Sequence, residues 1–309
     1  MADPLRLGAS LPQALALIAR WRPRAVFTTG GYVSIPVLTA AAAAAVPSLV
    51  WAGDRIPGRS IRATARLASA LAVSFEGSCE GLPQPCFVTG TPIRRLAGID
   101  RTVARERLKL PATGPLLLVF GGSQAVRSLN EAVAGTLSQL LERTAVLHIT
   151  GDSAYEEALQ RREALPEAQQ GRYRAYPSLG DEMADALVAA DLLVGRAGSS
   201  TLAEAAAVGL PLIVIPYPYA AAHQAANARE LVDAGAAMVI ADEDLDATAL
   251  LDASRILEDR ARLTAMSSAS RAQARPAAAR AVAELLQALA ERCPLPAPDR
   301  IERISREVA

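Results

Sequence analysis

The sequence has little of what marks several classes of protein. Its 309 residues carry 32 basic and 32 acidic side chains, so the basic excess that is typical of nucleic-acid-binding proteins is lacking. The three cysteines, Cys79, Cys86 and Cys293, show no metal-ligand spacing, and so sparse and odd a set predicts a reducing cytoplasm rather than a disulfide framework. The two histidines lie in different motifs and no acidic pair resembles a metal cage, so we expect no metal site. Neither a GxSxG elbow nor a P-loop is present.

Long hydrophobic runs are also scarce. The opening MADPLRLGAS lacks a basic region followed by an apolar core, so no signal peptide is expected. The longest apolar stretch, residues 35–52, is interrupted by Pro47, and a membrane-spanning helix needs about 20 apolar residues. We therefore interpret it as a buried helix that leads into a strand.

Short apolar runs alternate with longer helical stretches along the chain. The first series of expected strands covers residues 25–29, 48–52, 71–75 and 86–90. The second series covers residues 116–120, 145–149, 172–176, 191–195, 211–215 and 236–240. Continuous Val, Ile and Leu between helices predict parallel strands that are covered on both faces. The sequence thus predicts an α/β protein with two doubly wound, Rossmann-like domains.

An Arg-, Pro- and Gly-rich segment, residues 90–114, separates the two series. We expect a first domain at 1–92, a linker at 93–112, a second domain at 113–290 and a tail at 291–309, and we leave open that the last helix packs back on the first domain. A complete Rossmann domain has about six strands, so the first domain is expected to be incomplete, short by two β-α units or roughly 60–70 residues.

Two glycine pairs directly follow expected strands. Gly30 and Gly31 precede Tyr32, and Gly121 and Gly122 precede Ser123. Paired glycines allow backbone N–H groups to approach an anion, and the N-terminus of the following helix adds partial positive charge. Taken alone, the first pair favours a plain strand-to-helix turn, and the second is equally compatible with one in which Ser123 is only an N-cap.

A third loop follows the strand at 191–195 and is rich in small donors. Gly198 precedes Ser199, Ser200 and Thr201 at an expected helix start, which suits a diphosphate. Glu204 either closes a capping box with Thr201 or accepts hydrogen bonds from two ribose hydroxyls. Open α/β sheets bind ligands at the carboxyl ends of their strands, which favours the second interpretation.

A fourth loop follows the strand at 211–215. His223 and Gln224 are polar groups in an alanine-rich setting. They either face solvent at a helix start or recognise sugar hydroxyls, together with Asn227. His148, in contrast, lies in the middle of a strand, and we expect it to be structural.

Taken together, these segments resemble the MurG family of glycosyltransferases. The resemblance covers nearly the whole chain, in order and with matching spacing. It is carried by TTGGYVSIP (28–36), VTGTPIR (88–94), VFGGSQAVRSLNEA (119–132), ITGDSAYEE (149–157), the stretch 176–218 and HQAANARELVDAGAA (223–237). The resemblance implies the GT-B fold, in which two Rossmann domains are joined.

The resemblance also implies functions for particular residues. It places the donor, UDP-N-acetylglucosamine, on Arg94, Ser123, Leu179, Ser199, Ser200, Thr201, Leu202, Ala203, Glu204, His223 and Gln224, with Leu179 beside the uracil and Glu204 on the ribose. It places the acceptor's diphosphate at Gly30, Gly31 and Tyr32, and it leaves Asp54, Gly121, Gly122 and Asn227 as further candidates.

The implied reaction belongs to peptidoglycan synthesis and hence to cell-wall biogenesis, cell shape and cell division. A lipid-linked muramyl-peptide acceptor attacks C1 of the donor sugar with inversion, and UDP leaves without a metal. The implied partners are UDP-N-acetylglucosamine, a polyprenyl-diphosphate acceptor and the membrane surface, with no nucleic acid and no resident cofactor. The implied location is peripheral, on the cytoplasmic face of the cell membrane.

The sequence departs from the family in three places. The family's N-terminal Gly-Gly-Thr-Gly-Gly-His loop has no counterpart, so no residue is assigned as general base. The family's His-Glu-Gln-Asn is replaced by residues 51–54, with Asp54 in the Asn position, and Ala125-Val126 follow GGSQ in place of Gly-Ala. The alternatives are therefore another UDP-sugar lipid glycosyltransferase, a non-catalytic UDP-sugar-binding protein, or a fragment of a longer enzyme.

The first expected helix is a candidate membrane contact. Leu11, Leu15 and Ile18 recur on one helical face and Trp21 extends it, with three arginines close by at positions 20, 22 and 24. Such a face either lies on anionic headgroups or packs on the sheet.

Overall fold

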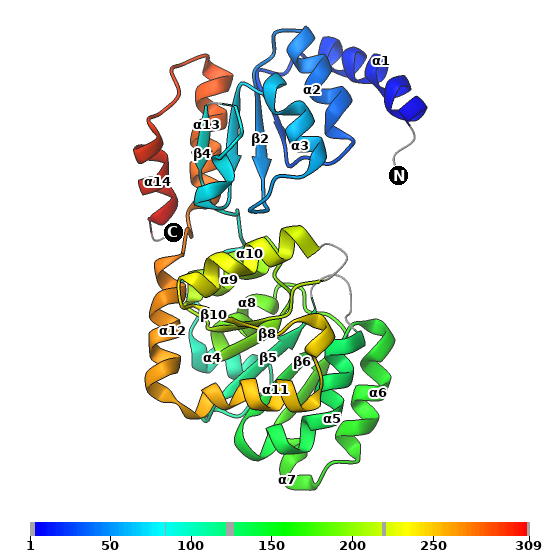
Figure 1. Cartoon of the computed structure of the whole chain (residues 1–309), viewed down its shortest axis with the longest axis vertical. Coiled ribbons are helices and arrows are strands. Elements are labelled where there is room, and N and C mark those ends of the chain that lie inside the picture. The colour runs from blue at the N-terminus through cyan, green and yellow to red at the C-terminus, as the bar shows by residue number, and fades with distance from the viewer. Residues whose placement is uncertain (1–3, 84, 122–126, 218–220, 308–309) are drawn as a thin grey trace. The chain divides into compact units, whose positions relative to one another are not determined.

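The computed structural model describes residues 4–83, 85–121, 127–217 and 221–307. The chain divides into two compact units (Figure 1). Unit 1 comprises Met1–Ile93 and Arg275–Ala309, and unit 2 comprises Arg94–Ala274. No helix among the described residues is both long and apolar enough to span a bilayer.

Unit 1 is built on a parallel sheet. Its strands, in the order in which they pair, are β1 (Val26–Thr28), β2 (Ser48–Ala52), β3 (Ala70–Val73) and β4 (Cys86–Val88). Every residue of β3 is buried, as expected for a parallel strand with both faces covered. Among the described residues β1 is an edge strand, and its Phe27 is 41% exposed.

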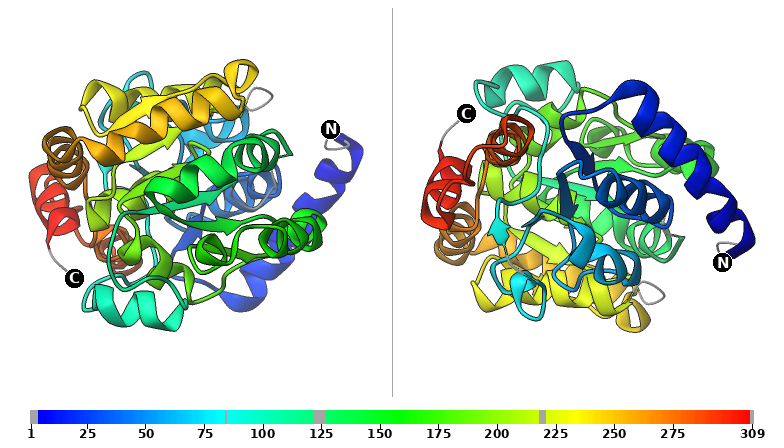
Figure 2. Two further views of the ribbon diagram at one scale, coloured as in Figure 1. Left: turned by 90° about the horizontal axis from the view of Figure 1, so that it is seen from below. Right: turned by 90° about the horizontal axis from the view of Figure 1, so that it is seen from above.

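Helices cover both faces of this sheet. The helical elements of unit 1 are α1 (Pro4–Trp21), α2 (Ser34–Ala43), α3 (Arg59–Thr64), η1 (Ala65–Leu67), η2 (Glu76–Cys79), α13 (Ala278–Glu291) and α14 (Pro298–Arg306). Leu285 and Leu289 of α13 and Ile301 of α14 pack against Leu49 and Phe87 on one face. Leu38 of α2 and Ile61 of α3 pack on the other. Helix α1 lies along α2 (Figure 2, right).

Unit 2 contains a larger parallel sheet. Its described strands are β5 (Leu116–Phe120), β6 (Ala145–Ile149), β7 (Tyr173–Tyr176), β8 (Leu192–Gly195), β9 (Leu212–Val214) and β10 (Ala237–Val239). They pair in the order β10-β9-β8-β5-β6-β7. This is the strand order of a complete Rossmann domain, and the direction of winding reverses between β5 and β8.

The helical elements of unit 2 flank that sheet. They are α4 (Arg101–Arg107), α5 (Arg127–Arg143), α6 (Asp152–Glu163), α7 (Glu167–Gln170), α8 (Met183–Ala189), α9 (Ser199–Val208), α10 (Ala221–Asp233), η4 (Asp242–Asp244), α11 (Ala247–Ser254), η5 (Arg255–Glu258) and α12 (Arg260–Ala272). Helices α5 and α11 lie side by side (Figure 2, left) and pack on β5 and β8 through Leu129, Leu140 and Leu250. Aspartates cap α4, α11 and α12 by accepting backbone N–H groups.

The α/β class and both series of parallel strands are confirmed, with each strand within two residues of its expected bounds. The segments expected as linker and tail differ from the structure. Residues 93–112 contain α4, whose Arg105 is buried, and α4 packs on α8 within unit 2. The tail contains α14, which packs on α13 and β4 because Ile301 and Ile304 add to the apolar core of unit 1.

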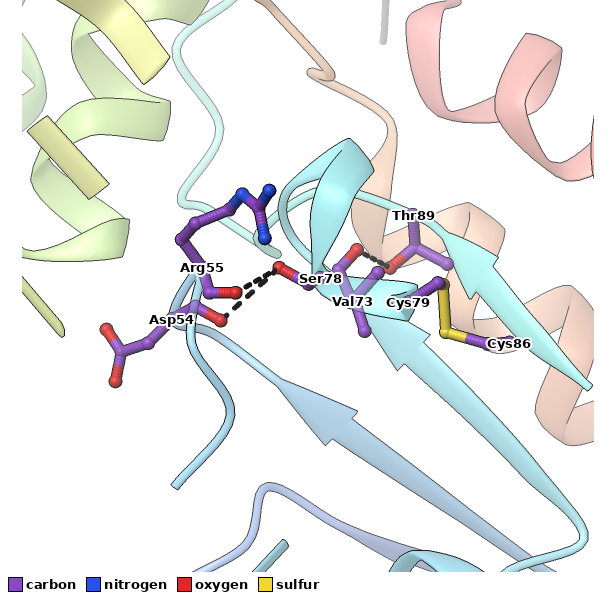
Figure 3. The surroundings of a disulfide bond; sticks show 7 residues. All are labelled: Asp54, Arg55, Val73, Ser78, Cys79, Cys86 and Thr89. Atoms are coloured by element: carbon purple, nitrogen blue, oxygen red, sulfur yellow. Dashed lines mark hydrogen bonds between the residues drawn. A yellow bond between two sulfur atoms is a disulfide. The ribbon is translucent and has the colours of Figure 1, made fainter. Parts of the chain in front are cut away.

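The expectation that the cysteines stay reduced is wrong for two of them. Cys79 and Cys86 form a disulfide with their Cα atoms 5.8 Å apart, and it joins the last residue of η2 to the first residue of β4 (Figure 3). Only Cys293 is free, and it is exposed. The number of cysteines could not predict this pair. The two residues meet because the chain reverses between the end of η2 and the start of β4, within seven residues.

The apolar face expected on α1 is split by the structure. Ile18 is buried and Leu11 is partly buried, and both pack with Ala40 and Ala41 of α2. Leu15 is 40% and Trp21 is 72% exposed. A continuous membrane-contacting face that includes Leu11 and Ile18 is therefore wrong, because those two side chains belong to the core.

His148 is structural, as expected. In unit 2 its Nε2 lies 3.0 Å from Asn130 Oδ1, and its Nδ1 lies 3.0 Å from the Tyr173 hydroxyl. Asn130 Nδ2 donates to the carbonyl of Thr150, which turns Asn130 Oδ1 toward the imidazole. Since an amide oxygen only accepts, Nε2 carries the proton and Nδ1 accepts from Tyr173. Burial lowers the pKa of His148 to about 4 and raises that of Tyr173.

This buried imidazole makes the stability of unit 2 depend on pH. Between the ordinary pKa of 6.5 and the folded pKa of about 4, the unfolded chain binds a proton that the folded chain refuses, so stability falls as pH falls. At pH 5 the expected loss is about 2 kcal/mol relative to pH 7.5. We expect His148→Gln to remove this part of the pH dependence in urea unfolding. An equal pH dependence in both proteins would contradict a neutral His148.

Candidate functional site

The reversal of winding between β5 and β8 sets the position of the candidate site. In open α/β sheets the loops that leave two such strands diverge to opposite faces, which opens a crevice at the carboxyl ends. Gly195 ends β8, and a Cβ atom placed on it would lie only 2.6 Å from the carbonyl oxygen of Phe120 at the end of β5. A glycine is needed there because the two backbones meet so closely. Gly121 follows β5 at this point and is half-buried, whereas Gly122 and Ser123 lie outside the described residues.

Helix α9 begins at this edge with an uncapped N-terminus. Its first residue is Ser199, and its N-cap is Gly198, which has no side chain to offer the first N–H groups. Ser200 is exposed and Ser199 and Thr201 are half-buried, so small donors surround these N–H groups. The arrangement suits an anion, since the helix dipole adds to the free donors. Leu202 is buried and Ala203 is half-buried on the next turn of the helix.

Glu204 does not close a capping box. The helix starts at Ser199, so Thr201 is not the N-cap. The Glu204 carboxylate is instead bound by Arg94, with 2.7 Å between Arg94 Nε and Glu204 Oε1. Arg94 Nη1 also donates to the carbonyl of Gly180, 2.9 Å away and adjacent to Leu179. Three expected donor-binding segments, from distant parts of the chain, thus meet at one guanidinium group.

Two polar residues of the fourth loop, Gln224 and Asn227, hold neighbouring loops in place. Gln224 Oε1 accepts the backbone N–H of Tyr217 at 2.9 Å, which fixes the loop after β9. His223 and Gln224 are both half-buried near the start of α10. Asn227 is fully buried, and its Nδ2 donates to the carbonyl of Ala197. Asn227 therefore fixes the loop after β8 through this bond, and its side chain is not accessible to a ligand.

Sequence reasoning missed the residue that ties these loops together. Arg196 follows β8 and is 6% exposed. Its guanidinium lies 2.7 Å from Asp242 in η4, donates to the carbonyl of Ile215 and stacks over the ring of Tyr217 at 5.3 Å. The Ser128 hydroxyl of α5 donates to the same carboxylate oxygen of Asp242. A charged residue directly after a fully apolar strand was the available signal.

In unit 1, the first glycine pair forms a left-handed turn after β1. Gly30 has φ +86° and Gly31 has φ +84°, conformations that other residues rarely adopt. Thr28 Oγ1 accepts the N–H of Gly30, and Ser34 Oγ donates to the carbonyl of Gly31. The turn leads into α2, whose N-cap Val33 provides no side-chain acceptor. The first N–H groups of α2 donate instead to the carbonyls of Gly31 and Tyr32, so the N–H groups of Gly31 and Tyr32 themselves are the ones that could meet an anion. The Tyr32 side chain is 52% exposed.

Asp54 lies in the loop after β2, also in unit 1. The buried hydroxyl of Ser78 donates to the carbonyl of Arg55 at 2.9 Å and lies 3.5 Å from the carbonyl of Asp54 (Figure 3). These bonds fix the backbone of the loop beside the disulfide of Cys79. Within the described part of the chain, no group of three or more His, Cys, Asp and Glu residues is arranged to hold a metal ion.

Comparison with known proteins shows that the chain is a glycosyltransferase. The model of the glycosyltransferase family 28 C-terminal domain matches residues 116–282, more than half of the chain. A crystal structure of Acinetobacter baumannii MurG superposes with a TM-score of 0.76 at 27% identity, covering 93% of this chain and 81% of that one. The UDP complex of S. aureus MnaA, with a TM-score of 0.67 at 14% identity, shares the fold alone.

Two curated relatives narrow the assignment. Both are named UDP-N-acetylglucosamine–N-acetylmuramyl-(pentapeptide) pyrophosphoryl-undecaprenol N-acetylglucosamine transferase. The protein of Desulforudis audaxviator is 37% identical over 299 residues, 94% of this chain and 80% of the relative. That of Roseiflexus sp. is 39% identical over 315 residues, 88% of this chain and 71% of the relative. The chain belongs to the MurG family of glycosyltransferases.

The Arg196 network predicts a specific stability effect. Arg196→Met leaves Asp242 without its buried cation and removes the stack on Tyr217. We therefore expect the free energy of unfolding to fall by about 2 to 3 kcal/mol. The control is Arg229→Met, because Arg229 pairs with Asp233 at 3.7 Å with both side chains at least 70% exposed. Scanning calorimetry should show a lower Tm for Arg196→Met only. Equal melting temperatures for the two variants would remove Arg196 from the support of the loops.

Proposed function

We propose that this chain transfers N-acetylglucosamine from UDP-N-acetylglucosamine to a lipid-linked muramyl-pentapeptide, the step from lipid I to lipid II in peptidoglycan synthesis. The reaction is the one that the names of the two relatives state, and the arrangement of residues in this chain is compatible with it. The observation that carries the proposal is the meeting of Glu204, Arg94 and the 179–180 segment beside the uncapped start of α9.

The donor lies along the carboxyl edge of the unit 2 sheet. Its ribose hydroxyls donate to Glu204, its uracil lies against the backbone at Leu179, and its diphosphate accepts from the first N–H groups of α9. Gln224 Oε1 accepts the N–H of Tyr217, which fixes the orientation of the amide and leaves its Nε2 group to donate to the sugar. His223 lies one residue away. Both the amide and the imidazole can then recognise sugar oxygens.

The acceptor's diphosphate binds at the Gly30–Gly31 turn. The donors proposed for it are the backbone N–H groups of Gly31 and Tyr32, because that of Gly30 donates to Thr28 Oγ1 and the first N–H groups of α2 donate to carbonyls of the turn. The acceptor's sugar hydroxyl attacks C1 of N-acetylglucosamine, and the bond from C1 to the UDP oxygen breaks with inversion. The negative charge that develops on UDP is stabilised by the N-terminus of α9 and its hydroxyl side chains.

Binding of UDP tests the donor site. Glu204→Ala removes hydrogen bonds to a charged group, which weakens UDP binding by about 1.5–3 kcal/mol. Isothermal titration calorimetry measures this loss. The control is Glu157→Ala, which breaks only the surface pair of Glu157 with Arg161 on α6. If Glu204 had only a structural role, the melting temperature would fall and the affinity for UDP would stay intact.

A lipid acceptor requires contact between unit 1 and the membrane surface. Val33 is 80% and Tyr32 is 52% exposed, and both directly follow the glycine turn. An acceptor held by its diphosphate at Gly30 and Gly31 brings its polyprenyl chain to these side chains. We propose that they touch the bilayer, in the way that apolar residues anchor peripheral proteins. The exposed Leu17 and Trp21 lie in the last turns of α1, which lead into the start of β1, whereas Tyr32 follows the end of β1.

Vesicle co-sedimentation distinguishes these two apolar surfaces. Tyr32→Ser with Val33→Ser should reduce binding to anionic vesicles several-fold, because it removes apolar area at the proposed contact. Leu17→Ser with Trp21→Ser removes similar exposed area at the other end of β1 and should leave binding unchanged. Loss of binding in the second variant alone would assign the contact to α1 and its neighbouring arginines.

A further inference from the structure

The guanidinium of Arg94 joins two segments that come from different parts of the Rossmann fold. Through Nε it holds Oε1 of Glu204 on α9, and through Nη1 it holds the carbonyl of Gly180 in the loop after β7. The Glu204 side chain is 9% exposed and the Arg94 side chain is 40% exposed. Arg94 therefore covers a buried carboxylate while remaining accessible at one end.

The pairing leaves Glu204 able to bind a ligand. Oε2 of Glu204 has no partner among the described residues, and it is not among the unpartnered side-chain atoms that are sealed from solvent. A carboxylate offers about four acceptor positions, of which Arg94 uses one. The ion pair thus fixes the direction of the carboxylate without occupying it.

The guanidinium is also the group best suited to this double contact. Its donors stand in a rigid plane, so Nε and Nη1 set the Glu204 carboxylate and the Gly180 carbonyl at a fixed separation. A lysine carries the same charge on a single flexible nitrogen and cannot hold both acceptors in a defined geometry.

The position of the Arg94–Glu204 pair on α9 indicates that it contacts a part of the donor other than the diphosphate. Glu204 lies five residues beyond Ser199, which is about 7.5 Å along the helix axis from the start of α9. The N–H groups suited to the diphosphate are at that start. Two of the three nitrogens of Arg94 are already engaged, Nε by Glu204 and Nη1 by the carbonyl of Gly180.

We propose that Arg94 is a positioning residue for the nucleoside half of the donor. It aligns the Glu204 carboxylate for the ribose hydroxyls and holds the 179–180 backbone for the base, and it acts through these groups rather than by neutralising phosphate. This inference rests on the proposed donor site. It makes Arg94 responsible for discrimination between ribose and 2′-deoxyribose, since a fixed carboxylate penalises the loss of a hydroxyl that it binds.

The test compares Arg94→Gln, Arg94→Lys and the control Arg95→Gln, which removes the same charge from the neighbouring exposed arginine. Binding of uridine is followed by NMR titration, and binding of UDP and 2′-deoxy-UDP by calorimetry. We expect Arg94→Gln to weaken uridine and UDP by the same factor, about tenfold, and to lower the preference for UDP over 2′-deoxy-UDP. We expect Arg94→Lys to behave like Arg94→Gln.

The opposite results would overturn the inference. If Arg94→Gln weakens UDP and leaves uridine unchanged, or if Arg94→Lys restores UDP binding, then Arg94 acts on phosphate as a charge. If both Arg94 variants bind like Arg95→Gln, Arg94 has no function in nucleoside binding. Wild-type protein that binds neither uridine nor UDP would instead refute the proposed donor site, so the two failures are distinguishable.

Discussion

Parallel strand pairing is the constraint on which the chemistry of this protein depends. Parallel strands place all their carboxyl ends at one edge, so the loops after β5, β8 and β9 converge although they lie far apart in the sequence. The reversal of winding between β5 and β8 keeps that edge open. The close approach of Gly195 to Phe120 allows the two strands to end together, and α9 starts four residues later with its N–H groups uncapped.

Two ion pairs in unit 2, that of Arg105 with Asp191 and that of Arg94 with Glu204, differ in whether they leave a group available to a ligand. Arg105, 4% exposed beside the start of β5, donates to Asp191 and to the carbonyls of Ala189, Pro111 and Gly114, and burial lowers its pKa. Its donors are consumed internally, as expected for a structural group. Glu204 at the opposite edge keeps one oxygen available, which is the property that a ligand-binding carboxylate needs.

Much of this architecture could be predicted from the sequence. Apolar runs gave every described strand, because a strand buried on both faces needs a continuous run such as 116–120. The glycine and serine loops directed attention to the carboxyl edge of the unit 2 sheet, where Arg94 contacts both Glu204 and the 179–180 segment. The partnership of Arg94 with Glu204 and the network of Arg196 with Asp242 could not be predicted, since they depend on side-chain contacts between segments 110 and 46 residues apart. The disulfide could not be predicted either, because it also depends on which segments the fold brings together. Which side of α1 is buried could not be predicted because it depends on where α2 packs.

The central claim is that the donor binds along the carboxyl edge of the unit 2 sheet, with its nucleoside on Glu204 and its diphosphate at the start of α9. A crystal structure of this chain with UDP tests the claim most directly. The account predicts both ribose hydroxyls within hydrogen-bonding distance of Glu204, with the Arg94 ion pair retained, and diphosphate oxygens on the N–H groups of residues 199–201. A nucleotide bound elsewhere, or one whose diphosphate rather than ribose lies on Arg94, would contradict it.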